Sequence, residues 1–326
     1  MRRLDPDLWD AVIVGGGLAG LSAAVYLGRT KLRTLLVDAG HSMARWEPVV
    51  ENYLGFPDGI SGEALLERGR EQVRRFGTEQ AKDEIRAVSR TGEGFVLEGI
   101  RRRYRSRTVL LATGLTHLLP DIPGAEACLG RSLLFCKDCD AYRMQGKRIA
   151  VYGRRNEAAR YALAMLAFSP AVAVLTDGKE ALWDGQWEHD LSEYSIPVRR
   201  QRIRGLLHED GWLRAVRFDD GPDCSVDAIF ATRGDVCHTG LAEALGAAKD
   251  DEGQLRVDED MRTAVPGLYA AGCLTPANCQ MIIAAGQGAT AAQAINRDLF
   301  VEDLRGGSLP RADQCRGSGR ATKQTV

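Results

Sequence analysis

The chain has 326 residues, of which 44% are hydrophobic and 27% charged, a composition typical of a globular protein that buries a sizeable core. Its formal net charge of −1 gives no reason to expect nucleic acid or an anionic membrane as a partner. The first nine residues are charged and include Pro6, and no later stretch has the length of a transmembrane span, so we expect a cytoplasmic protein.

The first strongly patterned segment is a strand, a glycine turn and a helix near the N-terminus. A short apolar run ends at Val14 and is followed by Gly-Gly-Gly-Leu-Ala-Gly at 15–20 and then by Ala-rich helical sequence. In a Rossmann unit, Gly15 permits the tight turn, Gly17 lets a pyrophosphate approach the backbone, and Gly20 lets the helix pack closely on the strand. Only the second task requires a ligand, so a turn used for packing alone is the alternative.

A carboxylate at the end of the next predicted strand completes this pattern. The strand covers residues 33–37 and ends at Asp38. An acidic residue about 20 positions after the glycine turn accepts hydrogen bonds from ribose hydroxyls in dinucleotide sites. The combination predicts a dinucleotide-binding domain.

A pair of cysteines follows in the middle of the chain, in Cys-Lys-Asp-Cys-Asp at 136–140. Two intervening residues let the sulfurs of Cys136 and Cys139 meet across one helical turn and form a reversible disulfide. The other cysteines and histidines supply no second close pair, so we predict no metal site. Asp140 can hold the proton that moves when a thiolate attacks or leaves, with a solvated side chain or a helix cap as the alternative. Which cysteine is the nucleophile stays open.

The second predicted Rossmann unit has a broken fingerprint. A strand at 147–152 precedes Gly-Arg-Arg-Asn-Glu-Ala at 153–158 and a helix. Arg155 stands where a pyrophosphate needs a bare backbone, which indicates a narrowed or filled groove, although an arginine can also bind phosphate. After the next strand, Asp177 stands where a 2′-phosphate would need arginines. The pattern speaks against NADPH and leaves NAD binding, or a domain kept as scaffold, as alternatives.

The remaining cysteines are scattered along the chain. Cys273 and Cys279 are six positions apart; a redox pair across a loop is one interpretation, but we predict two buried, inert thiols. The segment 305–326 is rich in Gly, Arg, Ser and Thr, and we predict that it is disordered.

Together these segments resemble the low-molecular-weight thioredoxin reductase family, from about Asp10 to Leu304. The resemblance rests on the glycine turn at 15–20, Val-Glu-Asn-Tyr-Leu-Gly-Phe-Pro at 50–57, Ala-Thr-Gly at 112–114, the cysteine segment at 136–140, and Val-Pro-Gly-Leu-Tyr-Ala-Ala-Gly at 265–272 with the helix after Ala284.

The resemblance implies an α/β fold of two Rossmann-like three-layer domains. An FAD-binding domain, 1–118 and 245–304, would be interrupted by an inserted nucleotide-binding-type domain, 119–244, that carries the cysteine pair. It also implies a homodimer, and electron transfer from the flavin to the disulfide and then to a thioredoxin-like protein or a small disulfide.

The resemblance further implies the roles of individual residues. Cys136 and Cys139 would be the redox pair and Asp140 the acid–base group. The residues expected at the cofactor are Gly15, Gly17, Leu18, Ala19, Gly20, Asp38, Ala39, Trp46, Asn52, Ala112, Thr113, Gly114, Gly272, Cys273, Gln280, Met281, Ile282 and Ala285.

Three departures from the family pattern bear on function. The nicotinamide groove is broken at Arg155, the family's Gly-Gly-Gln stretch near the flavin is Met-Ala-Arg-Trp at 43–46, and the aspartate that would hydrogen-bond the ribityl region is Cys273. Trp46 would stack on a flavin face and close the space of a nicotinamide or a second flavin; a core or interface tryptophan is the alternative.

The hypothesis that follows is an FAD-dependent dithiol/disulfide oxidoreductase that does not use NADPH directly. Electrons would come from ferredoxin or from another flavin, reach the Cys136–Cys139 disulfide, and pass to a protein disulfide. The alternatives are an NAD(P)H-dependent thioredoxin reductase, a dithiol oxidase that passes electrons to oxygen, and a non-catalytic flavoprotein.

Overall fold

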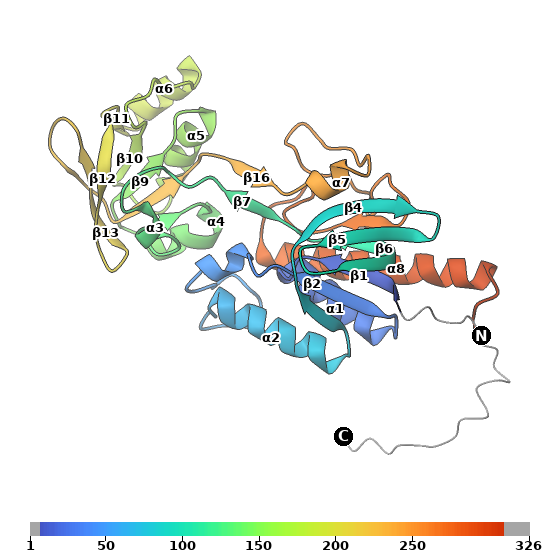
Figure 1. Ribbon diagram of the computed structural model, residues 1–326. Coiled ribbons are helices and arrows are strands. Elements are labelled where there is room, and N and C mark those ends of the chain that lie inside the picture. Colours follow the sequence, from blue (N-terminus) through green and yellow to red (C-terminus); the bar gives the residue numbers. More distant parts are fainter. Residues whose placement is uncertain (1–6, 310–326) are drawn as a thin grey trace. The chain divides into compact units, whose positions relative to one another are not determined.

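The structure is a computed structural model that describes residues 7–309 (Figure 1). They form two compact units. The first unit contains the chain up to Ser42, Gly69–Gly114 and the chain from Thr239, and the second unit contains Met43–Arg68 and Leu115–His238. The domain boundaries given above remain a prediction, and most of the predicted disordered tail lies outside the described residues.

A seven-stranded sheet forms the centre of the first unit. Its order is β3-β2-β1-β6-β5-β4, and β17 also pairs with β6. The strands are β1 Leu8–Val14, β2 Thr34–Asp38, β3 Glu79–Lys82, β4 Ile85–Thr91, β5 Gly94–Gly99, β6 Arg103–Leu111 and β17 Leu268–Ala270. The first half of β6 pairs with antiparallel β5, and its last three residues pair with parallel β17. The interior strands β1 and β2 are apolar runs because both of their faces are covered, whereas the parallel edge strand β3 is polar and mostly exposed.

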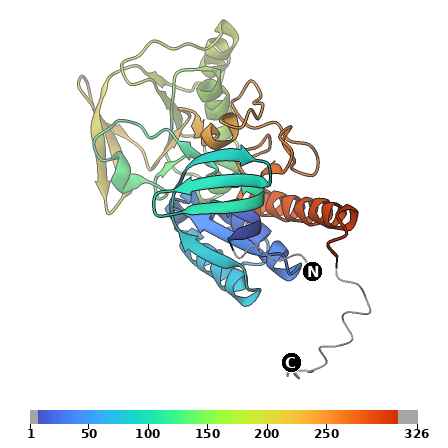
Figure 2. The same ribbon diagram turned by 45° about the vertical axis from the view of Figure 1, so that its right-hand side comes forward.

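Two helices of the first unit pack side by side, α1 Leu18–Arg29 and α8 Met281–Arg305. Figure 2 shows α8 in red beside the blue N-terminal elements. The helices approach closely because Gly288 has no side chain: a Cβ there would lie 2.0 Å from the carbonyl oxygen of Ala19. The start of α1 is therefore fixed by a helix that comes from the other end of the chain.

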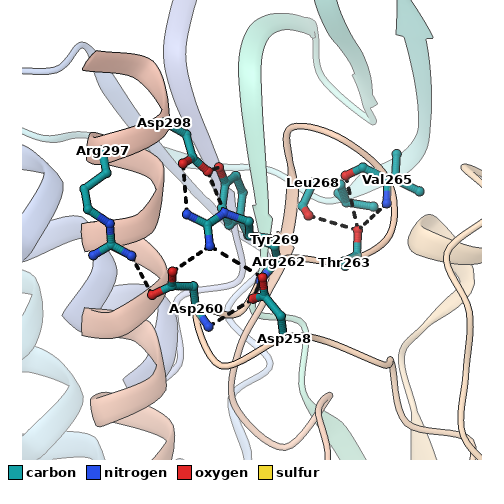
Figure 3. Close-up of polar contacts among 9 residues, drawn as sticks. All are labelled: Asp258, Asp260, Arg262, Thr263, Val265, Leu268, Tyr269, Arg297 and Asp298. Carbon is teal, nitrogen blue, oxygen red and sulfur yellow. Dashed lines mark hydrogen bonds and ion pairs between the residues drawn. The ribbon is translucent and has the colours of Figure 1, made fainter. Parts of the chain in front are cut away.

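A polar network ties α8 to the loop before β17. Figure 3 shows the Arg262 guanidinium between the carboxylates of Asp298 and Asp260. The Nε of Arg262 lies 2.7 Å from Asp298 Oδ2, to which the Tyr269 hydroxyl also donates, and Arg297 pairs with Asp260. Hydrogen bonds lower the pKa values of both carboxyls: those from Arg297 and then Arg262 act on Asp260, and that from Arg262 acts most on Asp298. The network holds α8 on the end of the sheet at which Leu268 begins β17.

A second, fully parallel sheet of order β11-β10-β9-β15-β8 forms the centre of the second unit. Its strands are β8 Leu133–Leu134, β9 Ile149–Tyr152, β10 Val172–Leu175, β11 Val198–Arg199 and β15 Ala228–Ala231. The three central strands are buried along their whole length. Together with the first sheet, this arrangement confirms the predicted α/β class with two Rossmann-like regions.

The other elements are short or lie at the edges of the sheets. The strands are β7 Leu115–His117 and β16 Asp235–Cys237, which pair with each other, and β12 Ile203–Glu209, β13 Trp212–Phe218 and β14 Cys224–Ser225, which form a three-stranded sheet. The helices are α2 Gly62–Arg75, α3 Ala125–Cys128, α4 Lys137–Asp140, α5 Asn156–Met165, α6 Gly185–Glu193 and α7 Gly240–Glu243, with 3-10 turns at Met43–Trp46 and Ala141–Met144. Within residues 7–309, the helices are all too short or too polar to cross a bilayer.

Candidate functional site

The cysteine pair lies at the start of the short helix α4. Cys136 and Cys139 form a disulfide with their Cα atoms 5.3 Å apart, and the backbone N–H of Cys139 donates to Cys136 Sγ at 3.1 Å. Both residues are partly exposed, although buried Leu134 ends the preceding strand β8. A disulfide with two intervening residues and access to solvent fits a redox-active pair.

Asp140, the predicted acid–base residue, is 2% exposed and its carboxylate pairs with the guanidinium of Arg143. Burial raises the pKa of Asp140, against the opposing effect of Arg143 and with a smaller contribution from Glu51. The alternative of a solvated aspartate is therefore wrong, and Asp140 makes no side-chain hydrogen bond as a cap of the following 3-10 turn. A buried carboxyl beside the dithiol is suited to hold a proton.

Glu47 is a second carboxyl in this group, and no pattern in the sequence predicted it. Burial, with repulsion from Asp140, raises the pKa of Glu47 to about 7, while Arg143 opposes the shift. Glu47 follows the 3-10 turn that ends at Trp46, and its carbonyl accepts the N–H of Gly62. Only the tertiary fold brings this carboxyl to Asp140, and a group that titrates near neutral pH is suited to proton transfer.

Trp46 and Asn52, which were expected at the cofactor, belong to the second unit with the cysteine pair. The ring of Trp46 lies 6.4 Å from that of Phe135, and the Phe135 ring stacks on His117 at 4.5 Å. The Nδ2 of Asn52 donates to the Asp138 carbonyl at 3.4 Å. These contacts join the segment 43–68 to the cysteine segment within one unit.

The glycine turn in the first unit combines close packing at Gly15 with open space at Gly17. Gly15 has a φ of +110°, and a Cβ there would lie 2.3 Å from the Ala112 carbonyl oxygen. Gly17 is the N-cap of α1. Among the described residues, only Ser42 comes within 4 Å of the position that a Cβ of Gly17 would take, with its Oγ at 3.6 Å. Tight packing explains Gly15, whereas the space beside Gly17 at a helix N-terminus fits a diphosphate.

Asp38 is bound to the same turn. Its Oδ1 accepts the backbone N–H groups of Gly16 and Gly40, each at 3.0 Å. Both of these hydrogen bonds use one oxygen of the carboxylate, so the geometry is compatible with a ribose hydroxyl on Oδ2. Ala39 follows Asp38 in the loop after β2.

The other predicted cofactor residues of this unit come from two further segments. Ala112 continues from β6, and its N–H donates to the Val14 carbonyl at 2.8 Å. Gly272 has a φ of +84° and donates its N–H to Gln287 Oε1 at 2.8 Å. The remaining positions are Thr113 and Gly114 after β6, Gln280 at the N-cap of α8, and Met281, Ile282 and Ala285 in its first turns. These segments belong to the same unit as the turn at Gly15 to Gly20.

The second fingerprint, at 153–158, differs from the first in the residue at the start of its helix. Arg155, not a glycine, is the N-cap of α5, and its side chain is exposed. The carboxylate of Asp177 accepts hydrogen bonds from Ile203 N–H at 2.9 Å and from the Tyr152 hydroxyl at 3.1 Å. Both oxygens of Asp177 therefore have partners inside the second unit, whereas the two hydrogen bonds to Asp38 share one oxygen.

Cys273, predicted to be an inert buried thiol at the cofactor, forms a disulfide with Cys279. The prediction of two buried thiols is therefore wrong, and both residues are partly exposed. The loop after Gly272 folds back onto the start of α8, which brings the two sulfurs together.

Comparisons with known proteins agree with this architecture. A family model described as pyridine nucleotide-disulphide oxidoreductase matches residues 9–294. A thioredoxin reductase from Treponema pallidum is 30% identical over 295 residues, covering 88% of this chain and 95% of that protein. The structure of HlmI has a TM-score of 0.86 at 32% identity, covering 92% of this chain and 95% of that chain. TrxB from Bacillus anthracis has a TM-score of 0.84 at 27% identity, with coverages of 90% and 99%.

Proposed function

The chain belongs to the pyridine nucleotide-disulphide oxidoreductase family, and from this premise we propose a thioredoxin reductase-like enzyme that does not take electrons directly from NADPH. The resemblance to thioredoxin reductases is confirmed by relatives that match most of the chain. The protein is an FAD-dependent disulfide oxidoreductase, and its Cys136–Cys139 pair fits a redox disulfide. The electron donor and the substrate belong to the proposal.

We propose that the first unit holds FAD with the glycine turn, Asp38 and the segments around Gly114, Gly272 and the start of α8. The N–H groups at the start of α1 would face the diphosphate, and Asp38 would accept a ribose hydroxyl. FAD, when bound, supplies two-electron redox chemistry. The space beside Gly17 supports this assignment.

In the second unit, the proposed chemistry is exchange between the cysteine pair and a substrate disulfide. The pair gains two electrons and two protons when its S–S bond is reduced, and becomes two thiols. One thiolate then attacks a sulfur of the substrate, the other displaces the mixed disulfide, and the substrate leaves with two thiols. The N–H of Cys139, which already donates to Cys136 Sγ, would stabilise a thiolate on Cys136.

The observation that carries the proposed independence from NADPH is the structure of the second fingerprint. Arg155 puts a side chain at the N-cap of α5, where the equivalent residue of the first fingerprint is Gly17. The internal hydrogen bonds of Asp177 leave it poorly suited to bind ribose. By exclusion of direct NADPH, we propose ferredoxin or another flavin as the donor.

We expect that neither NADPH nor NADH will bleach the bound flavin within minutes under anaerobic conditions, whereas dithionite will reduce it fully. The reason is that the protein has no open groove at Arg155 for the diphosphate of a nicotinamide dinucleotide. The measurement is the flavin absorbance after each addition. Arg155→Gly is the matched variant, and faster bleaching by NADH in this variant would assign the block to the arginine. Rapid bleaching of the unmodified protein would instead restore an NAD(P)H-dependent reductase.

We propose that Glu47 stores the proton that Asp140 exchanges with the cysteine pair. Because the pKa of Glu47 is about 7, we expect an inflection near pH 7 in the rate at which the reduced pair reacts with a small disulfide. Glu47→Gln should remove this inflection, which rapid mixing between pH 5 and 9 would measure. Glu188→Gln is the control, since hydrogen bonding to Trp183 lowers the pKa of that carboxyl.

The same pKa makes stability depend on pH. A carboxyl whose pKa is raised from 4.5 to about 7 binds a proton more tightly in the folded state, so stability falls as the pH rises through this window. Denaturant unfolding should show a smaller loss of stability between pH 5 and 8 for Glu47→Gln than for the unmodified protein. An unchanged inflection in the rate, together with an unchanged slope in stability, would remove Glu47 from the mechanism.

The substrate and the assembly that we propose are based on the similarity of the chain to thioredoxin reductases. The relatives named thioredoxin reductase support a thioredoxin-like protein, or a small disulfide, as the electron acceptor. We also propose a homodimer and a cytoplasmic location. Size-exclusion chromatography with light scattering would test the dimer.

A further inference from the structure

A second disulfide closes the loop between β17 and α8 in the first unit. It joins Cys273 to Cys279, whose Cα atoms are 4.9 Å apart, well within the range that disulfides span. The bridge encloses only residues 274–278. It is separate in sequence from the Cys136–Cys139 pair, which belongs to the other unit.

This bridge is open to small reagents. Cys273 and Cys279 are partly exposed, and the enclosed residues Pro276, Ala277 and Asn278 are exposed. Cys128, by contrast, has an exposed fraction of 0%. A small thiol can therefore approach the sulfurs of the bridge but not the sulfur of Cys128.

Hydrogen bonds hold the enclosed loop independently of the bridge. The hydroxyl and the backbone N–H of Thr275 both donate to the Gly272 carbonyl oxygen, each at 2.9 Å. The N–H of Leu255 donates to the Leu274 carbonyl at 2.9 Å. The side chain of Gln287 accepts the N–H of Gly272 at 2.8 Å. Because none of these hydrogen bonds uses the S–S bond, we expect the fold to persist when the bridge is reduced.

The two sulfurs differ in their surroundings. Cys279 immediately precedes Gln280, the N-cap of the 25-residue helix α8, whose first turn has no acidic residue. The partial positive charge of a helix N-terminus stabilises a nearby thiolate. Cys279 is therefore the better leaving group, and Cys273 is the sulfur that an incoming thiolate attacks.

We propose that Cys273 and Cys279 form a second redox centre, which is reduced by dithiols through thiol–disulfide exchange. A thiolate of the dithiol attacks Cys273 Sγ, the Cys273–Cys279 bond breaks, and Cys279 leaves as a thiolate. The second thiol of the donor then displaces Cys273 from the mixed disulfide. The dithiol loses two electrons and two protons and becomes a disulfide, and the protein gains two thiols. This centre does not depend on the function proposed for Cys136 and Cys139.

Peptide-resolved alkylation of the full chain tests the proposal. Trypsin releases both cysteines in one segment, 263–297, because no Lys or Arg lies between Arg262 and Arg297, whereas Cys136 and Cys139 fall in other segments. The protein as purified is incubated anaerobically, without denaturant, with reduced and then with oxidised dithiothreitol. N-ethylmaleimide traps the thiols at each stage before mass spectrometry.

We expect segment 263–297 to carry no alkyl group before reduction, two after reduction, and none after reoxidation. Cys128 should remain unlabelled throughout, because it is buried, and circular dichroism should show an unchanged fold. In a Cys273→Ser variant, Cys279 should be alkylated without any reductant. The proposal is overturned if the unreduced segment already carries two alkyl groups, or if the bridge resists dithiothreitol until denaturant is added, which is the behaviour of a purely structural crosslink.

Discussion

Cys139→Ser is expected to lower the rate of disulfide reduction by at least about 10³-fold while leaving bound FAD in place. The serine hydroxyl cannot form the S–S bond that Cys136 makes in the structure, so the pair cannot take up two electrons. The loss should therefore be confined to the exchange step. The fold should be kept, since Cys139 is a partly exposed residue of the short helix α4 and does not belong to a core strand.

Rapid mixing measures this loss. Enzyme reduced with dithionite and freed of excess reagent is mixed with a small aromatic disulfide, and the released thiolate is followed by its absorbance. Cys224→Ser is the matched control, because Cys224 is also partly exposed but belongs to neither disulfide, and it should keep the full rate. Substantial activity in Cys139→Ser would show that other sulfurs carry the reaction.

Gly17→Arg is expected to weaken FAD binding by at least about 100-fold, or ~2.8 kcal/mol, without unfolding the protein. The position has room for a side chain in the absence of ligand, because only Ser42 Oγ lies near the missing Cβ, at 3.6 Å. That room is where the proposed diphosphate would lie, at the N-terminus of α1. The variant places in the first fingerprint the residue type that Arg155 supplies in the second.

The absorbance of the purified variant at flavin wavelengths, and equilibrium titration of added FAD, measure this effect. Gly20→Ala gives the contrasting case: its Cβ would lie 1.9 Å from the Gly15 carbonyl oxygen, so it should lower the melting temperature as well as flavin content. A Gly17→Arg protein that retains FAD at the normal ratio would show that the cofactor is held elsewhere.

The sequence was sufficient for features whose signals are local. Apolar runs before the two fingerprints predicted β1 and β9, since strands of a parallel sheet are buried on both faces. The spacing of Cys136 and Cys139 predicted their bridge, because two intervening residues let the sulfurs meet across one helical turn. Such features need no knowledge of the rest of the chain.

The features that were missed depend on tertiary contacts. Glu47 reaches Asp140 only after segment 43–68 packs with the cysteine segment, and the raised pKa arises from burial there. The bond between Cys273 and Cys279 depends on how the intervening loop turns, and a separation of six residues does not determine that turn. Charge, burial and loop direction at these sites are properties of the folded chain, so no local pattern in the sequence predicts them.

The contact between Gly288 and Ala19 also bears on the order in which the two units can fold during synthesis, because it joins an early helix to a late one. All of the second unit, 43–68 and 115–238, precedes β17 and α8 in the chain, whereas the first unit needs both of these late elements. A ribosome therefore releases every residue of the second unit before α8 exists. During that interval the second unit can complete its core, but the face of α1 that Gly288 later covers stays exposed to water and to chaperones. The packing of α1 is therefore completed only after α8 has been made.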